Sequence, residues 1–197
     1  MCRLSAITSA EYFSPMENIL ALETMKEGHD GSGLGLMLKD LGGPFEEFKG
    51  HPVLSAVCSN QGLMALDAYM KVQGFKEKFT WAPNIKNVPG VERRENYLAK
   101  VYDYPESYWD KPMTAKEDLL MHTRLALRKV GEPDGSLFVF SFYPDVLTLK
   151  EVGDPLALGE FFGLDRSDIK AKIVLAQGRQ NTNYAIYLYA CHPFFIQ

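Results

Sequence analysis

The sequence predicts an α+β protein in which separate helices pack on antiparallel sheets. Two strand-like segments are neighbours in the chain, residues 138–142 and 146–152, and a Tyr-Pro-Asp turn joins them. The predicted helices, which have clear start signals, lie in other parts of the sequence than these paired strands. They do not alternate regularly with single strands, as they would in an α/β protein. Because no internal repeat or linker interrupts the chain, we expect residues 1–197 to form one domain.

The first elements are predicted by local signals. Residues 2–8 are rich in apolar side chains, and we expect them to form a strand that places the N-terminus inside the fold. A helix follows, because the Ser14 hydroxyl can cap it, Pro15 suits its first position and Glu17 completes a capping box. Gly28 predicts the end of this helix.

A glycine-rich loop, residues 28–33, leads into the apolar run 34–38, which has the length of a strand. The order is therefore helix, glycine loop, strand. Dinucleotide-binding loops have the opposite order, because the phosphate binds at the amide groups of a helix start. The loop therefore does not indicate a nucleotide site.

Residues 45–112 show a less regular pattern, with two tryptophans and five prolines, and a solvent-facing helix is expected near residues 65–72. A second capping box at residues 114–117 predicts a helix that ends at Gly131. Asp154-Pro155 predicts the start of a short helix. A strand is expected at 170–176, followed by the polar stretch 177–183.

Composition and charge exclude several classes of function. With 21 basic and 25 acidic residues, the net charge of −4 gives no broad basic field that nucleic acids or anionic membranes would select. No apolar run approaches the roughly 20 residues of a membrane span, so we expect a cytoplasmic protein. The three cysteines lack the spacing of a metal site or disulfide framework, and we expect no cofactor in this domain.

Cys2 is the residue most suggestive of catalysis, because removal of Met1 would give it a free α-amine beside its thiol. An α-amine has a pKa of ~7.7 to 8.0 and can act as a general base near neutral pH. Cys2 would then supply both nucleophile and base. The alternative is a small buried cysteine without a catalytic role, which is how we interpret Cys58 and Cys191.

Three segments together resemble class II glutamine amidotransferases, a family of N-terminal nucleophile hydrolases. These segments are Met1-Cys2, the Lys26–Gly33 loop and residues 176–194, and the resemblance is closest to the amidotransferase domain or subunit of glutamate synthases. The loop matches the family's R-G-H/Y-D-x-x-G segment except that Glu27 replaces the arginine. The resemblance implies a four-layer αββα sandwich, incomplete here because the chain ends before the family's Asn-Gly pair.

Carried over by position, the resemblance makes Cys2 the catalytic nucleophile and Arg179 the residue that binds the α-carboxylate of L-glutamine. An arginine offers two parallel charge-assisted hydrogen bonds to a carboxylate, which would orient the substrate amide toward the sulfur. Thr182 and Asn183 match the family's Thr-Asn pair and are expected to shape the same pocket. His192-Pro193-Phe194 matches a further family segment, and His192 is expected to orient the chain after Arg179.

The resemblance implies hydrolysis of glutamine to glutamate through a Cys2 thioester, with ammonia delivered to a glutamate-synthase-type partner domain or subunit. Two departures predict impaired turnover. Arg3 follows the cysteine where the family has glycine, and it would lower the thiol pKa or crowd the site. The missing Asn-Gly pair would supply the oxyanion hole, and losing one such donor costs ~100 to 1,000-fold in rate.

Three alternatives remain open at the level of sequence. One is a non-catalytic amidotransferase-like domain that regulates or scaffolds a synthase, and another is an N-terminal nucleophile amidase with a different substrate. A metal-binding module is the weakest, since the Cys and His residues lack ligand spacing. The adjacent His29 and Asp30 do not indicate a triad, because such pairs on a glycine turn usually bond to the local backbone. His122 is expected to be a structural residue of the helix that ends at Gly131.

Overall fold

The computed structural model describes residues 3–25, 33–131 and 133–178, and the chain divides into two compact units. The first unit is built from three stretches: Met1–Glu47, Pro83–Arg93 and Thr148–Gln197. The second is built from Phe48–Ala82 and Arg94–Leu147. Both contain helices and antiparallel strands, so the α+β class is confirmed.

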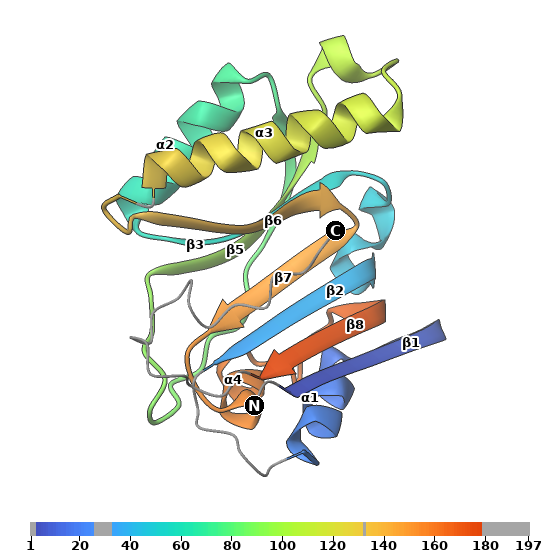
Figure 1. Cartoon of the computed structure of the whole chain (residues 1–197), viewed down its shortest axis with the longest axis vertical. Helices are drawn as coiled ribbons and strands as arrows, with labels where there is room; N and C mark the ends of the chain where they lie inside the picture. Colours follow the sequence, from blue (N-terminus) through green and yellow to red (C-terminus); the bar gives the residue numbers. More distant parts are fainter. Residues whose placement is uncertain (1–2, 26–32, 132, 179–197) are drawn as a thin grey trace. The chain divides into compact units, whose positions relative to one another are not determined.

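The sheet of the first unit has the strand order β1-β8-β2-β7. The bounds are β1 (Arg3–Phe13), β2 (Leu34–Gly42), β7 (Val146–Glu151) and β8 (Lys170–Gly178). Two helices, α1 (Pro15–Glu23) and α4 (Pro155–Phe161), pack against each other, and α1 also packs on β1 and β8 (Figure 1). The predicted strands at 2–8, 34–38 and 170–176 are all present, and each is longer than expected.

The starts of both helices follow the predicted capping chemistry. The Ser14 hydroxyl accepts a hydrogen bond from the Met16 amide at 3.3 Å, and Pro15 occupies the first helical position. Asp154 caps α4 in the same way through the Leu156 amide. The end of α1 was predicted wrongly, because the helix stops at Glu23 and Thr24 is its C-cap. Gly28 lies outside the described residues.

The sheet of the second unit has the order β4-β5-β3-β6. Its strands are β3 (Pro52–Cys58), β4 (Lys76–Trp81), β5 (Asn96–Asp103) and β6 (Leu137–Pro144), and its helices are α2 (Asn60–Val72) and α3 (Met113–Gly131). Two short 3₁₀ helices, Gly43–Phe48 and Glu106–Tyr108, complete the described elements. Both α2 and α3 pack on β6, and α2 also packs on β3 (Figure 1).

Residues 45–112, whose sequence pattern is less regular, contain three strands and a full helix. β3 is buried along its whole length, so its sequence lacks the alternation that identifies a half-exposed strand. The helix expected near residues 65–72 begins earlier, at Asn60, and one of its faces is buried instead of exposed to solvent. Its Leu66 and Met70 are buried in the core.

The second predicted capping box was also wrong. α3 begins at Met113, one residue before the supposed cap Thr114, which lies inside the helix. The Pro112 carbonyl accepts hydrogen bonds from the Ala115 and Lys116 amides and so begins the helical ladder. The predicted end at Gly131 is confirmed.

The two strands predicted around the Tyr-Pro-Asp turn are present as β6 and β7, but they belong to different sheets. Asp145 makes the turn with a left-handed φ of 56°, which aspartate tolerates better than most residues. Its carboxylate accepts a hydrogen bond from the Gly50 amide at 2.9 Å. The turn therefore separates two sheets instead of closing a hairpin.

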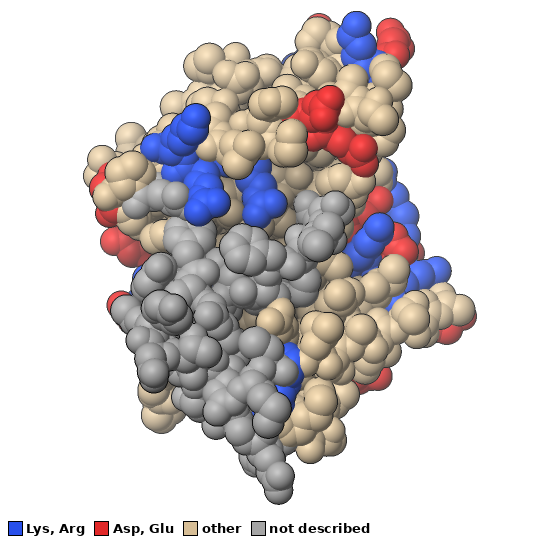
Figure 2. Space-filling model, viewed as in Figure 1, with Lys and Arg blue, Asp and Glu red and all other residues tan. Residues whose placement is uncertain are grey.

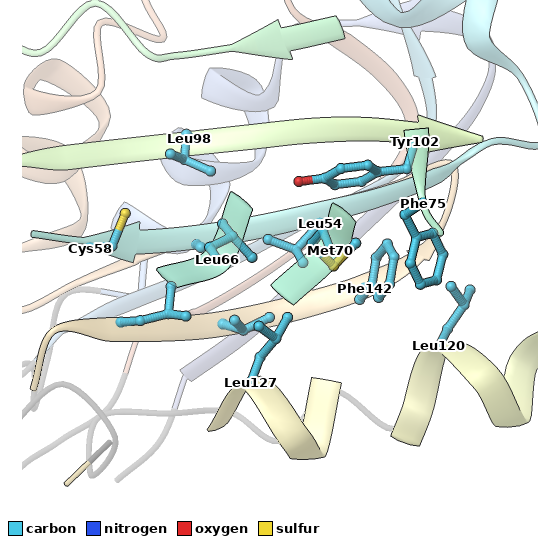
Figure 3. Close-up of a cluster of buried hydrophobic side chains, with 13 residues drawn as sticks. Leu54, Cys58, Leu66, Met70, Phe75, Leu98, Tyr102, Leu120, Leu127 and Phe142 are labelled. Carbon is cyan, nitrogen blue, oxygen red and sulfur yellow. The ribbon is translucent and has the colours of Figure 1, made fainter. Parts of the chain in front are cut away.

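The core of the second unit lies between its sheet and its two helices (Figure 3). Its buried members are Leu54, Ala56, Cys58, Leu66, Met70, Phe75, Leu98, Tyr102, Leu120, Leu127, Leu137, Val139 and Phe142. The rings of Phe75, Tyr102 and Phe142 contact one another, with centroids 5.3 to 6.1 Å apart. Such ring contacts add to the free energy gained from burial.

Replacing Tyr102 with phenylalanine is expected to stabilise the protein. The Tyr102 hydroxyl is buried and has no hydrogen-bond partner among the residues that the structure describes, and burial raises the phenol pKa. An unsatisfied buried hydroxyl costs ~1 to 3 kcal/mol, so Tyr102→Phe should raise the free energy of unfolding by about 1 kcal/mol in urea denaturation. Tyr97→Phe is the control and should lower it, because the Tyr97 hydroxyl accepts from the Arg94 amide at 3.3 Å. Equal losses in both variants would contradict this interpretation.

Basic side chains gather over α3 on the face that Figure 2 shows. Arg128 and Lys129 lie in the last turn of α3, where positive charge is favoured by the helix dipole. None of the helices in the described part of the chain is long and apolar enough to cross a membrane.

Candidate functional site

All four site residues proposed from the sequence, Cys2, Arg179, Thr182 and Asn183, lie outside the described residues. The same is true of Glu27, His29, Asp30, Cys191 and His192. Their immediate neighbours in the chain are described: β1 begins at Arg3, and β8 ends at Gly178. The structure therefore bears on the site through the strands that lead into it.

The register of the first sheet brings the starts of β1 and β2 and the end of β8 to one edge. Arg3 at the start of β1 pairs with Gly178 at the end of β8, and Leu34 at the start of β2 pairs with the same Gly178 (Figure 1). In the sequence, residue 2 precedes β1, the glycine loop precedes β2, and Arg179 follows β8. The described ends of these three strands, which are far apart in the sequence, are therefore neighbours in the sheet.

Gly33, the last residue of the glycine loop, is described and has a φ of 143°. This positive φ is accessible to glycine and strongly disfavoured for other residues. Leu34 follows at once as the first residue of β2, and it is buried. The positive φ that the backbone adopts just before β2 therefore explains the glycine at position 33, independently of any function of the loop.

Arg3 is buried, with only 7% of its surface exposed. Its Nη1 donates to the carbonyl oxygen of Leu22 at 3.3 Å and to that of Met25. These carbonyls lie at the C-terminal end of α1, where a cation is favoured by the helix dipole. The guanidinium that the sequence led us to expect beside the thiol is thus held by the end of α1.

A buried asparagine fixes α1 to the strands that lead into this edge. The Asn18 amide nitrogen donates to the carbonyl oxygens of Val174 at 2.7 Å and Ser5 at 3.2 Å, and its oxygen accepts from the Ser5 hydroxyl at 2.5 Å. Asn18 has no exposed surface. Sequence reasoning missed it, although its place on the inward face of the helix with Ile19 and Leu22 was a usable signal.

No protein-family model and no curated protein matches the chain. The support for the candidate site therefore consists of the sequence motifs and the register of the strands beside them. The family assignment stays a proposal.

Cys58, the cysteine that the structure describes, fits the expected core role. It is buried among the hydrophobic residues of the second unit, and desolvation by burial raises its thiol pKa to about 11. A thiol with this pKa is almost entirely protonated at neutral pH and is a poor nucleophile. Cys58 is thus not a competing catalytic cysteine.

A buried lysine in the second unit, Lys100, is a possible alternative nucleophile, but its surroundings do not suit that role. Lys100 is buried, yet its ammonium lies 2.6 Å from an Asp67 oxygen and 2.7 Å from a Glu77 oxygen. Burial lowers the Lys100 pKa, but the two carboxylates outweigh this and raise it. A nucleophilic lysine requires the opposite shift. Lys100 is therefore a structural cation.

Two histidines in the second unit also have local partners. The Nε2 of His51 lies 3.2 Å from an Asp103 oxygen, and its Nδ1 lies 3.1 Å from the Phe48 carbonyl oxygen. His122 lies in α3 as expected, with Nδ1 2.7 Å from the Asp118 carbonyl oxygen. Within residues 3–25, 33–131 and 133–178, no group of three or more His, Cys, Asp or Glu side chains could hold a metal ion.

Proposed function

We propose that the chain is the N-terminal portion of a class II glutamine amidotransferase domain, with Cys2 as its nucleophile. The observation that carries this proposal is the shared pairing of Gly178 with Arg3 and Leu34. An N-terminal nucleophile and a carboxylate-binding arginine must approach one substrate, and this register leads both segments to one edge.

The architecture supports the proposal at a coarser level. Each unit consists of an antiparallel sheet with helices packed on it, and each could form one half of a four-layer αββα sandwich. This layer order is what the resemblance implies for N-terminal nucleophile hydrolases.

The proposed reaction is acyl transfer to sulfur followed by hydrolysis. The α-amine of Cys2 takes the thiol proton, and the sulfur attacks the carboxamide carbon of L-glutamine. The carbon–nitrogen bond breaks, and the amine returns its proton to the departing ammonia. Water then attacks the thioester, the carbon–sulfur bond breaks, and glutamate leaves. In the proposed setting, the ammonia passes to a glutamate-synthase-type domain or subunit.

The experiment that tests this function combines intact mass with a product assay. We expect the purified chain to lack Met1 and to release glutamate and ammonia from L-glutamine in equal amounts. Retention of Met1 in the active protein would contradict the base role of the amine. Processed protein that releases no glutamate, even over many hours at saturating glutamine, would favour a non-catalytic domain.

Arg179→Ala is expected to raise the KM for L-glutamine. Loss of two charge-assisted hydrogen bonds to the substrate carboxylate should weaken binding by roughly 10- to 100-fold. Initial rates of glutamate release over a range of glutamine concentrations give KM and kcat separately. Arg166→Ala is the control, because Arg166 has 86% of its side chain exposed. An unchanged KM in Arg179→Ala would remove this residue from the substrate site.

A further inference from the structure

The outer face of α3 exposes two large apolar side chains. α3 packs on the core of the second unit through residues that include Leu120 and Leu127, both of which are buried. Met121 and Leu125 lie one helical turn apart and are 51% and 47% exposed. A single exposed apolar residue is common on protein surfaces. Two neighbours on one stripe of a helix can instead contact a second helix together.

α2 exposes further apolar side chains on the same helical layer. Its Leu66 and Met70 are buried in the same core cluster as Leu120 of α3, so both helices cover the same side of the sheet, and α2 also packs on α3. Met64 and Val72 of α2 are 74% and 81% exposed. Additional apolar surface is therefore available for a contact that α3 makes with another molecule.

Charged residues lie at both ends of the exposed stripe of α3. Asp118 precedes the apolar pair by about one turn, Lys129 follows it by about one turn, and both are exposed. With His122 and Leu125, which are also exposed, they form a row that we call the α3 seam. Its residues are separated by four, three and four positions, which is the spacing of side chains along the contact line between two packed helices.

The charges of the α3 seam are complementary to those of a second, antiparallel copy. In that orientation, Asp118 of each copy lies opposite Lys129 of the other, and His122 lies opposite Leu125. Each pairing occurs twice, as a two-fold axis requires. In a parallel pair, Asp118 would face Asp118 and Lys129 would face Lys129, and like charges repel. Charge complementarity therefore favours a second copy of this chain in one orientation.

We propose that the chain forms a two-fold homodimer in which the α3 seams of two copies pack against each other antiparallel. α3 has 19 residues and is therefore about 28 Å long, so a contact strip about 10 Å wide buries roughly 600 Å² in total. Stable interfaces bury more than about 1,200 Å², so this dimer is a weak one. We expect a Kd on the order of 100 μM.

Sedimentation velocity of the full chain from ~10 μM to ~1 mM tests the homodimer. We expect a concentration-dependent shift from monomer to dimer, and a monomer throughout this range overturns the proposal. Leu125→Ser should weaken self-association by ~10-fold or more, because each dimer loses two apolar contacts. Leu20→Ser is the control, since Leu20 lies on α1 and is 50% exposed. Equal effects of the two substitutions overturn the α3 seam as the interface.

Charge exchange tests the antiparallel orientation. Asp118→Lys and Lys129→Glu should each weaken self-association by roughly 10-fold, because attraction at both ends of the seam becomes repulsion. The double variant Asp118→Lys/Lys129→Glu restores the complementary order and should associate as the unaltered chain does. It should not pair with the unaltered chain, since like charges would then meet at both ends. Failure of the double variant to regain association overturns the proposed pairing.

The variants are expected to fold normally, because all four seam positions are exposed. Near-UV circular dichroism of each variant checks this. The homodimer is independent of the proposed glutaminase function, since α3 belongs to the second unit and none of the residues proposed for glutamine binding lies on it. Self-association without glutamate release would keep the dimer and reject the function. Glutamate release by a chain that stays monomeric would do the reverse.

Discussion

Cys2→Ala is expected to reduce glutamate release to background, a loss on the order of 10⁴-fold or more. The reason is that one residue supplies the attacking sulfur, so no thioester can form without it. The assay is the time course of glutamate release from L-glutamine at saturation. Because the α-amine is kept in this variant, its inactivity would be assigned to the thiol alone.

Cys58→Ala is the matched control for this prediction. Cys58 is a buried thiol whose raised pKa of about 11 keeps it protonated at neutral pH. Its removal should lower the free energy of unfolding by about 1 kcal/mol and leave the rate of glutamate release unchanged. Retained activity in Cys2→Ala, or equal losses in both variants, would contradict the assignment of the nucleophile.

Gly62→Ala is expected to have the largest effect on stability. A Cβ added at Gly62 would lie 1.9 Å from the Ser136 carbonyl oxygen and 3.2 Å from the Cys58 Cβ, so the backbone itself must move. The Gly62 amide also donates to the Ser59 hydroxyl that caps α2, at 3.0 Å. We expect a loss of about 3 kcal/mol and a fall in Tm of roughly 6 to 12 °C.

The neighbouring Gln61 provides the control for this substitution. Gln61 is exposed on the same first turn of α2, so Gln61→Ala should change the free energy of unfolding by no more than about 0.5 kcal/mol. Calorimetric melting of both variants and the parent protein gives the comparison. A loss below about 1 kcal/mol in Gly62→Ala would mean that the chain around Ser136 adapts easily.

Local chemistry explains which elements the sequence could predict. A side-chain oxygen before a proline determines a helix start within a few residues, and Ser14 and Asp154 both act as caps as expected. The same reasoning failed at Thr114, because the Pro112 carbonyl accepts the first helical hydrogen bonds earlier in the chain. A capping sequence alone does not exclude a start one residue before it.

Two of the strands that the sequence analysis missed share a different cause. β3 is buried throughout and β5 is buried except at its two ends, so both have apolar residues on both faces. Alternation, which identifies half-exposed strands, is therefore absent from them. Prolines between and after these strands then made the region look irregular.

The arrangement of the candidate site could not be predicted from local patterns. The motifs could be found in the sequence, but the positions of the strands beside them depend on pairing between residues far apart in the chain, such as Arg3 with Gly178. The burial of Arg3 was also not predicted from the sequence, because charged residues are usually exposed. Its environment is supplied by the end of α1.

The most direct test of the central claim changes the α-amine without changing any side chain. Two preparations are compared: the chain beginning with Cys2, and the same chain with one glycine added before it. The proposed mechanism predicts that only the first releases glutamate from L-glutamine, because the added glycine converts the catalytic amine into an amide. Equal rates of release in the two preparations would contradict an N-terminal nucleophile mechanism.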